Sequence, residues 1–580
     1  MRKRVARRLL ERPGVKRRLP VATCALLAAL SACAGSSGDL GGASPSGSGN
    51  ISGGAGTGFG PGAAGSSGFD AGPAGTGGTL PPETELESSY EVPVATGHFI
   101  WVANPTSGRV AYINAASFEV HTIEAGNAPT YIAPIPSSDD AVIVLNVLSD
   151  DATVLRVTAT GLDSQTVRGV AHGANALAVS SDGGWAIAWT DARRIKNADK
   201  FEGYQDLTVI KLDPQAPRKT IVTAGFRPVS IGFAADGSKA FAVTEDGITV
   251  VDLTGATGPR VSKNVIITDD ATEDVDTRDV SLTPNGALAL IRREGSAAIG
   301  IVDLATSARS QVTLSGPVTD LDLTTDGKRA VAVVRATAEV AILPLEAGTP
   351  TSAAVTHISV AGEVVGSVAL APGGGTALLY SNATKLERLT VLTLAPAPSY
   401  RVVKLHAPVL SVFPSGDGEN AVVLHADTSD GTPTPDGGPA PDGGSSEVDA
   451  GAAPPPVPHA GRAFSLVPLT ADLPAKIQTT DAPPEAVVLS PGGDRALITI
   501  HDDVKKVYAV YMGLFPTLEV QRVGLASPPI AAGVVAEAGR GYVAQKHPEG
   551  RITFVTLGSG EARTLTGFEL GSRVVDWTQP

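Results

Sequence analysis

Three pairs of charged residues lie within or beside short apolar runs, and these side chains have the types and spacing that could support chemistry. Catalysis requires acid, base or nucleophilic groups that are brought together with shifted pKa values. Arginine and aspartate in such pairs more often neutralise each other within a fold. The sequence therefore marks six candidate site residues, without a predicted catalytic role: Arg278, Asp279, Asp320, Asp322, Arg573 and Asp576.

Metal and cofactor motifs are scarce in this chain. The nine histidines show no H-x-H or H-E-x-x-H spacing. Asp430, Asp436 and Asp442 recur every six positions, and residues 269–276 form a denser acidic cluster, but neither contains the D-x-D-x-D-G loop of calcium sites. Motifs for phosphate-binding loops, haem attachment and serine nucleophiles are also missing from the sequence. We therefore expect no catalytic, cofactor-binding or metal-ligating residues.

The elements that must position the six candidates are short strands, and the stretch 227–255 shows the pattern most clearly. It contains three apolar runs separated by the turns Asp236-Gly237 and Asp246-Gly247. Asp and Gly accept the backbone angles that fold one strand back on another. The stretch therefore predicts consecutive β-hairpins.

Near-copies of this layout recur along the chain after residue 90. Nine turns, from Ser138-Asp139-Asp140 to Ala538-Gly539-Arg540, each precede an apolar second strand, mostly at intervals of about 41 to 54 residues. Phe99 to Asn104 supplies a tenth second strand. A third apolar run and a more polar fourth run follow in each unit, so the repeat predicts about ten four-stranded units.

The unit from His98 to Pro129 resembles the YVTN-type propeller repeat. Its segments WVAN, VAYIN, VHTI and GNAP match the YVAN-like, V-x-V-I-D-like, V-x-T-I-like and G-x-x-P segments of that repeat, with Asn114 in place of the final Asp. The resemblance implies an all-β fold, a β-propeller of four-stranded antiparallel blades. The candidate residues would then lie on innermost strands and line the central channel.

We predict one closed ring of about ten blades. The first unit begins at its second strand, and Ser572 to Trp577 follows the last unit as an unpaired apolar run. This C-terminal strand is therefore expected to close the ring as the innermost strand of the first blade, which would remove a free sheet end. Because propellers usually have about four to eight blades, two smaller rings or a ring of eight to nine blades are the alternatives.

Residues 1–32 are predicted to be an export signal. Nine Lys or Arg residues precede the twelve-residue apolar run from Leu19 to Leu30, which is shorter than the roughly 20 residues that span a bilayer. The segment Leu30-Ser31-Ala32-Cys33 resembles the lipobox of bacterial lipoproteins, which implies lipid on Cys33 and cleavage before it. Residue 34 is alanine. An aspartate at this position would resemble a signal for retention at the inner membrane, so we expect an outer-membrane lipoprotein of the cell envelope. The alternative is an ordinary signal peptide.

The remaining sequence divides into a tether and one domain. Residues 33–89 comprise the lipidated cysteine and a Gly/Ser-rich segment, in which 18 of the 47 residues from Ala34 to Leu80 are glycine. Such a composition predicts a flexible tether. Residues 90–580 form the predicted propeller, with a disordered insertion at 427–458 and a lengthened, positively charged loop at 191–205.

The charge balance limits the partners. Without residues 1–32 the chain has 36 basic and 58 acidic residues, a net charge of −22, which argues against nucleic acid. Membrane attachment through the lipid and a protein or glycan partner are expected. Two functions fit: a binding or scaffold module, or an exported enzyme similar to the lactonase-type propellers. An enzyme predicts converging Arg, His and carboxylate groups in a deep pocket, whereas a scaffold predicts exposed apolar loops.

Overall fold

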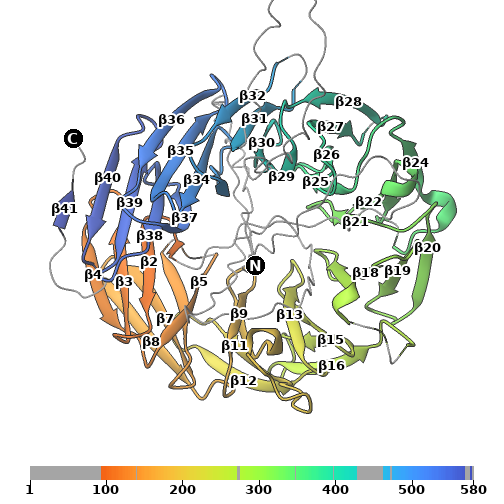
Figure 1. Ribbon diagram of the computed structural model, residues 1–580. Coiled ribbons are helices and arrows are strands. Elements are labelled where there is room, and N and C mark those ends of the chain that lie inside the picture. The colour runs from red at the N-terminus through yellow and green to blue at the C-terminus, as the bar shows by residue number, and fades with distance from the viewer. Residues whose placement is uncertain are drawn as a thin grey trace, which may run out of the picture.

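A computed structural model describes residues 93–568 except 137, 139, 271–272, 274, 347, 396, 427–461 and 471–472, together with the backbone of 575–577. Within these residues, antiparallel sheets of four strands form ten blades around one ring (Figure 1). The last sheet has a fifth strand. The predicted all-β propeller with ten blades in a single ring is confirmed, and neither alternative blade arrangement is correct.

Blades are numbered along the chain. The strands of blades 1 to 5 are β1 (Val94–Ala95), β2 (Phe99–Asn104), β3 (Arg109–Asn114), β4 (Val120–Glu124); β5 (Pro129–Pro134), β6 (Ala141–Asn146), β7 (Asp151–Thr158), β8 (Gly161–Arg168); β9 (Ala176–Val179), β10 (Trp185–Trp189), β11 (Asp206–Lys211), β12 (Arg218–Thr223); β13 (Pro228–Phe233), β14 (Lys239–Thr244), β15 (Gly247–Asp252), β16 (Arg260–Val265); β17 (Arg278–Leu282), β18 (Leu288–Arg293), β19 (Ala298–Asp303) and β20 (Arg309–Thr313).

The strands of blades 6 to 10 are β21 (Asp320–Leu323), β22 (Arg329–Val334), β23 (Glu339–Pro344), β24 (Thr356–Ser359); β25 (Ser367–Leu370), β26 (Thr376–Tyr380), β27 (Arg388–Thr393), β28 (Ser399–Lys404); β29 (Val409–Pro414), β30 (Asn420–His425), β31 (Ala463–Pro468), β32 (Lys476–Thr479); β33 (Pro484–Leu489), β34 (Arg495–Asp502), β35 (Val507–Leu514), β36 (Glu519–Gly524); β37 (Pro529–Val535), β38 (Arg540–Gln545), β39 (Arg551–Thr556), β40 (Ala562–Thr566) and β41 (Val575–Trp577). The 3-10 turns are η1 (Ala192–Arg194), η2 (Val275–Thr277), η3 (Arg335–Thr337) and η4 (Ser352–Ala354).

The hydrophobic core lies between neighbouring blades. Second and third strands are almost continuously apolar because blades cover both of their faces; β6, for example, is buried at every position. Ile143 of blade 2 and Ile210 of blade 3 belong to the same buried cluster. Fourth strands lie at the rim and are largely exposed, as in β12. The ring is therefore held together by side chains that interlock from blade to blade.

Of the two turns predicted in 227–255, Asp236-Gly237 joins β13 to β14, and Asp246-Gly247 joins β14 to β15 at the opposite end of the ring. We call the end that contains Asp236-Gly237 the turn face. It carries the connections from first to second and from third to fourth strands in each blade. The glycine of the first connection has a positive φ in most blades, +66° at both Gly237 and Gly327. This left-handed conformation is costly for residues with a Cβ atom, which is why the repeat requires glycine there.

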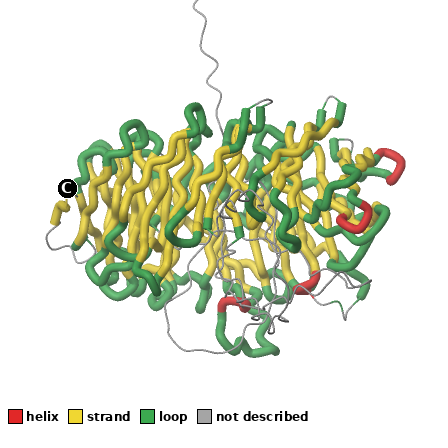
Figure 2. The backbone as a smooth tube through the Cα atoms, turned by 45° about the horizontal axis from the view of Figure 1, so that its top comes forward, coloured by secondary structure: helices red, strands yellow, loops and turns green. Residues whose placement is uncertain are grey.

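The opposite end of the ring, which we call the loop face, carries the longer connections. These join second to third strands and each blade to the next. The lengthened loop 190–205 with η1 and the acidic loop 266–277 with η2 both lie there, and Figure 2 shows the η1 loop projecting from the ring. Because the strands alternate in direction, every insertion after a second or fourth strand must emerge on this face.

The strand that was expected to close the ring does not do so. The innermost strand of blade 1 is β1, which pairs with β2 through Val94 and Ala95. The C-terminal strand β41 instead pairs with β40, at the outer edge of blade 10 (Figure 1). The prediction was wrong because a two-residue strand gives no hydrophobic period that could identify it, whereas β40 offers an open edge to the apolar C-terminal run.

Several predictions fall on residues that the structure does not describe. These are the export signal, Cys33 and its tether, the insertion at 427–458, and Arg573. In the described part of the chain, no helix has the length and apolar character required to span a membrane.

Candidate binding site at the ring seam

The candidate residue Arg278 on β17 joins blade 4 to blade 5. Its side chain is nearly fully buried, and its guanidinium donates to the Glu273 carboxylate at 3.0 Å. It also donates to the carbonyl oxygens of Thr244 and Glu245, at 3.1 and 2.8 Å, where β14 ends in the preceding blade. These contacts satisfy a buried cation and fix the relative position of two blades.

Asp320 and Asp322 join blades 6 and 7. They lie two residues apart on β21, so their side chains share one face of the strand. Asp320 accepts from the backbone N–H of Val368 at 2.7 Å, and Asp322 accepts from that of Leu370 at 3.2 Å, both on β25. Burial, and then the neighbouring Asp320 carboxylate, raises the pKa of Asp322 to about 7. This carboxyl group can exchange a proton near neutral pH, while its oxygens bridge two innermost strands.

The remaining three candidates lie elsewhere. Asp279 forms an ion pair with Arg292 on β18, within blade 5. Asp576 lies opposite Leu565 in β41, at the outer edge of blade 10, so the prediction that it lines the channel is wrong. That prediction depended on closure by the C-terminal strand. Arg573 lies outside the described residues.

Several histidines pair with carboxylates. His98 contacts Asp140 at 2.8 Å and so joins blade 1 to blade 2. The other close pairs are His172–Asp150 at 2.9 Å, His357–Glu339 at 2.6 Å and His501–Glu485 at 2.8 Å. Among the described residues, no group of three or more His, Cys, Asp or Glu side chains is arranged to hold a metal ion.

His425 is a buried polar residue that the sequence did not mark. Its Nδ1 donates to the Pro408 carbonyl oxygen at 3.1 Å, and its Nε2 accepts from the Ser465 hydroxyl at 2.7 Å. A carbonyl can only accept, so the proton is on Nδ1. Burial lowers the pKa of His425 to about 4, and the imidazole is therefore neutral at physiological pH. The only sequence signal was its place at the end of the apolar run NAVVLH.

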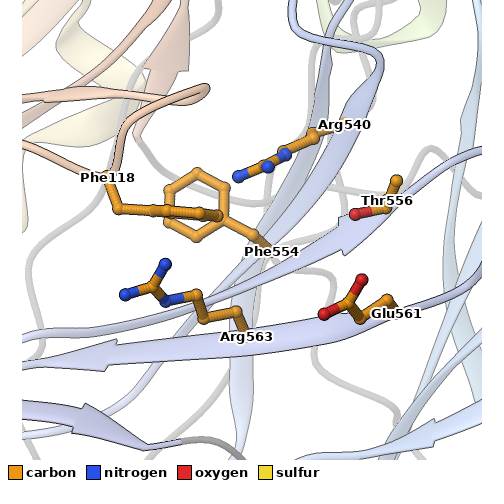
Figure 3. Close-up of a pocket in the computed structure, with 6 residues that line it drawn as sticks. All are labelled: Phe118, Arg540, Phe554, Thr556, Glu561 and Arg563. Carbon is orange, nitrogen blue, oxygen red and sulfur yellow. The ribbon is translucent and has the colours of Figure 1, made fainter.

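A cavity of about 160 Å³ lies at the contact between blade 10 and blade 1, which we call the seam (Figure 3). One lining residue, Phe118, comes from the turn between β3 and β4 in blade 1. The other lining residues come from blade 10: Arg540, Phe554, Thr556, Glu561 and Arg563. The cavity thus combines two cations, one carboxylate, one hydroxyl and two aromatic rings.

Phe118 of blade 1 is clamped by side chains of blade 10. The guanidinium carbons of Arg540 and Arg563 lie 4.0 and 4.3 Å from its ring centre, and Figure 3 shows them on opposite sides of the ring. The rings of Phe118 and Phe554 pack edge to face, with their centroids 5.1 Å apart. Each cation over an aromatic face stabilises the contact by about 0.5 to 1 kcal/mol where solvent is present.

The sequence contained one signal for this clamp: a phenylalanine at a turn position where blades 5 and 10 have serine and glycine. Phe118 has a φ of +64°, in a turn where its N–H donates to the carbonyl four residues earlier. Ser307 and Gly560 occupy the corresponding turns of blades 5 and 10, with φ of +64° and +73°. A bulky aromatic residue at a left-handed turn position is strained by about 1 to 2 kcal/mol. Its packing across the seam offsets that strain.

Arg540 also closes the ring through a contact that recurs around it. Its Nη1 donates to the carbonyl oxygen of Ala115, in the turn between β3 and β4, at 2.8 Å. The same kind of contact, from a basic side chain to the third-to-fourth strand turn of the next blade, joins Arg156 to Leu212, Lys263 to Ala305, Lys476 to Leu518 and Arg495 to Leu557. The seam is therefore built like the other blade contacts.

The electrostatic balance of the cavity favours an anion. Burial, and then the nearby Arg563 cation, lowers the pKa of Arg540. No ion pair with a carboxylate is found for Arg540 within the described residues. Sequence reasoning missed this cavity because Phe118 and Arg540 are separated by more than 400 residues.

Comparisons with known proteins identify no family. No protein-family model and no curated protein matches this sequence. Among solved structures, hydrazine synthase of Kuenenia stuttgartiensis matches at 16% identity over 54% of this chain and 97% of its own, with a TM-score of 0.30. The dihydro-heme d1 dehydrogenase NirN matches at 12% identity over 68% and 75%, with a TM-score of 0.37. These similarities are too low to carry any argument about activity.

Proposed function

We propose that this protein is a binding or scaffold module of the bacterial cell envelope, held at the outer membrane by lipid on Cys33. The export signal, the lipobox-like segment ending at Cys33 and the glycine-rich tether support the attachment. The YVTN-like repeat supports the same assignment, because the propeller fold is a scaffold on which loops can vary.

The observation that carries the binding role is the unequal distribution of exposed apolar side chains. Among the described residues, five strongly exposed or partly exposed large apolar side chains lie in loop-face connections: Leu148, Phe201, Ile266, Val364 and Val504. Leu473 is the one that lies in a turn-face connection. Phe201 and Val504 are 95% and 93% exposed. The five come from loops of different blades on the face with the longest loops, and long loops on a rigid scaffold commonly carry binding residues.

The alternative, a hydrolase, predicts that Arg, His and carboxylate groups converge in a deep pocket. The seam cavity contains arginine and glutamate but no histidine. We therefore propose binding, which the exposed loop-face side chains support, ahead of hydrolysis.

Photo-cross-linking tests the binding role. A photoreactive residue placed at Phe201 or Val504 should give discrete adducts with envelope components, because both tips project into solvent on the loop face. The same residue placed at Ile221 or Tyr400, which are partly exposed on fourth strands at the rim, serves as the control. Adducts that are equally abundant from the rim positions would contradict a loop-face contact surface.

Membrane attachment is tested separately by Cys33→Ser. A lipid on one cysteine supplies the anchor, so the variant should move from the membrane to the soluble fraction, while the parent protein stays with membranes. Cys24→Ser is the matched control and should fractionate like the parent, since Cys24 lies in the predicted signal. Membrane fractionation of the Cys33 variant would refute the attachment.

A further inference from the structure

We propose that the seam cavity binds a carboxylate monoanion that carries a small apolar group. This site lies on the turn face at the rim, away from the loop-face tips. It therefore depends neither on lipid attachment nor on a loop-face partner, and the experiments for the two proposals can fail independently.

The first argument is the number of donors. A guanidinium has five N–H donors, and among the described residues Arg540 uses one of them, toward Ala115. Arg563 contributes a second guanidinium from the other side of Phe118 (Figure 3). The Thr556 hydroxyl also lines the cavity. Carboxylates are suited to such donors, because arginine can bind both oxygens with parallel hydrogen bonds.

The second argument is charge. Two guanidinium groups stack on one phenyl ring, and their mutual repulsion contributes to the lowered pKa of Arg540. An anion in the cavity, hydrogen-bonded to either guanidinium at the edge of the Phe118 ring, would offset that repulsion. Glu561 already supplies one negative charge, so the lining residues carry a net charge of +1. A monoanion neutralises this charge, whereas a phosphate dianion would leave a net charge of −1 in the cavity beside Glu561. The geometry therefore favours carboxylate over phosphate.

The third argument is the shape and polarity of the walls. Phe118 and Phe554 form an apolar part of the cavity, edge to face at 5.1 Å. The volume of about 160 Å³ is well above the roughly 10 to 15 Å³ that a single water molecule needs. A carboxylate with a short alkyl chain or one ring fits this space. The carboxylate could belong to a free acid or to an acidic side chain of a peptide.

The test is a titration of the full mature protein with small anions at constant ionic strength, in which ligand-detected nuclear magnetic resonance measures binding. Acetate, butyrate and benzoate probe free acids, N-acetyl-glutamate N-methylamide probes an acidic side chain, and phosphate probes the competing anion. We expect saturable binding with butyrate or benzoate tighter than acetate, because the phenyl walls favour apolar groups. The relative affinity of the glutamate derivative decides between the two carboxylate sources.

Three variants locate the binding. Arg563→Gln should weaken carboxylate binding about tenfold, the effect of losing roughly 1.4 kcal/mol. Glu561→Gln should strengthen it by removing the opposing charge. Arg522→Gln, on β36 in an ion pair with Asp481, is the matched control and should bind like the parent. We do not substitute Arg540 first, because its hydrogen bond to Ala115 closes the seam and its loss could also disturb the fold.

The unfolding midpoint of each variant, measured without ligand, separates loss of binding from loss of fold. Equal binding by the parent and the folded Arg563→Gln variant would overturn the proposal. So would phosphate binding as tight as that of the best carboxylate, and so would unchanged affinity in Glu561→Gln.

Discussion

At the scale of single residues, burial determines the charge of two groups in this ring. Asp322 has a pKa of about 7, above its ordinary value of 3.8, and His425 has a pKa of about 4, below its ordinary value of 6.5. The folded protein binds more protons at Asp322 than the unfolded chain between pH 3.8 and 7, so the free energy of unfolding falls as pH rises through that range. His425 acts oppositely: it destabilises the fold as pH falls from 6.5 to 4.

Asp322→Asn should remove the first of these dependences. The amide cannot ionise, but it keeps one acceptor oxygen and loses one backbone hydrogen bond, a constant cost of about 1 to 3 kcal/mol. The parent protein loses up to about 4 kcal/mol between pH 4 and pH 8 because of Asp322. The stability advantage of the parent over the variant should therefore decrease as pH rises and change sign before pH 8, measured by urea unfolding at pH 5, 6, 7 and 8.

Asp326→Asn is the matched control for this measurement. Burial raises the pKa of Asp326, but hydrogen bonds from Thr324 and Lys328 outweigh it and lower that pKa overall. The carboxylate is then ionised throughout the range, and its variant should differ from the parent by a constant amount. A constant difference for Asp322→Asn as well would show that Asp322 is already ionised at pH 5.

At the scale of elements, several first-to-second-strand turns of the turn face serve two purposes. Gly327 allows the left-handed turn, and it also lies against the preceding blade, where an added Cβ would come within 2.6 Å of Pro284 Cδ. Gly286 lies in the same way against Phe241, and Gly493 against Asp417. The turns are therefore stacked around the ring, and each glycine of this kind supports both a hairpin and a blade contact.

Gly327→Ala should destabilise the protein through both effects. Backbone strain contributes about 1 to 2 kcal/mol, and the forced displacement of Pro284 adds about 1 to 3 kcal/mol. Gly539→Ala is the matched control, because Gly539 has a φ of +58° but open space around its Cβ position, so only the strain applies. Thermal and urea unfolding of both variants measure the difference. Equal destabilisation would show that the stacked turns add nothing to the blade contact.

At the scale of the whole molecule, the ring closes without a sheet shared by the two ends of the domain. Blade 1 is built from β1 to β4, and blade 10 from β37 to β41. The Tyr542 hydroxyl donates to the carbonyl oxygen of Pro93 at 2.9 Å, and Arg540 reaches Ala115. Ile100 and Phe554 share one buried cluster across the seam. Side-chain packing and a few hydrogen bonds therefore replace the backbone ladder that the sequence led us to expect.

This closure predicts unequal effects of two changes. Deleting residues 575–580 removes a short strand from an outer edge, so the unfolding midpoint should hardly change. Phe118→Ala removes the ring clamped between Arg540 and Arg563 and should destabilise the protein by about 2 to 4 kcal/mol.

Phe201→Ala controls for loss of a phenylalanine, because that side chain is 95% exposed and should leave stability unchanged. Differential scanning calorimetry compares the midpoints, and small-angle X-ray scattering detects an opened ring as a larger radius of gyration. A larger loss of stability from the deletion than from Phe118→Ala would restore the C-terminal strand as the closing element.

The sequence by itself determined most of the strands, the turn glycines and the number of blades, but neither β1 nor the place of β41. These depend on short-range causes: apolar runs that pair with the next run, and Asp-Gly steps such as Asp236-Gly237 that allow a reversal. Each unit repeats the same local pattern of apolar runs and turns, so about ten units predicted ten blades without knowledge of their contacts.

The tertiary structure alone decided how the ring closes and where side chains meet. The pairing of Asp320 and Asp322 with β25, and the clamp around Phe118, join segments whose separation along the chain leaves no mark on local pattern. The proton affinity of Asp322 follows from burial, which exists only once the blades pack. Long-range packing, and not the repeat, therefore creates the seam cavity and its charge.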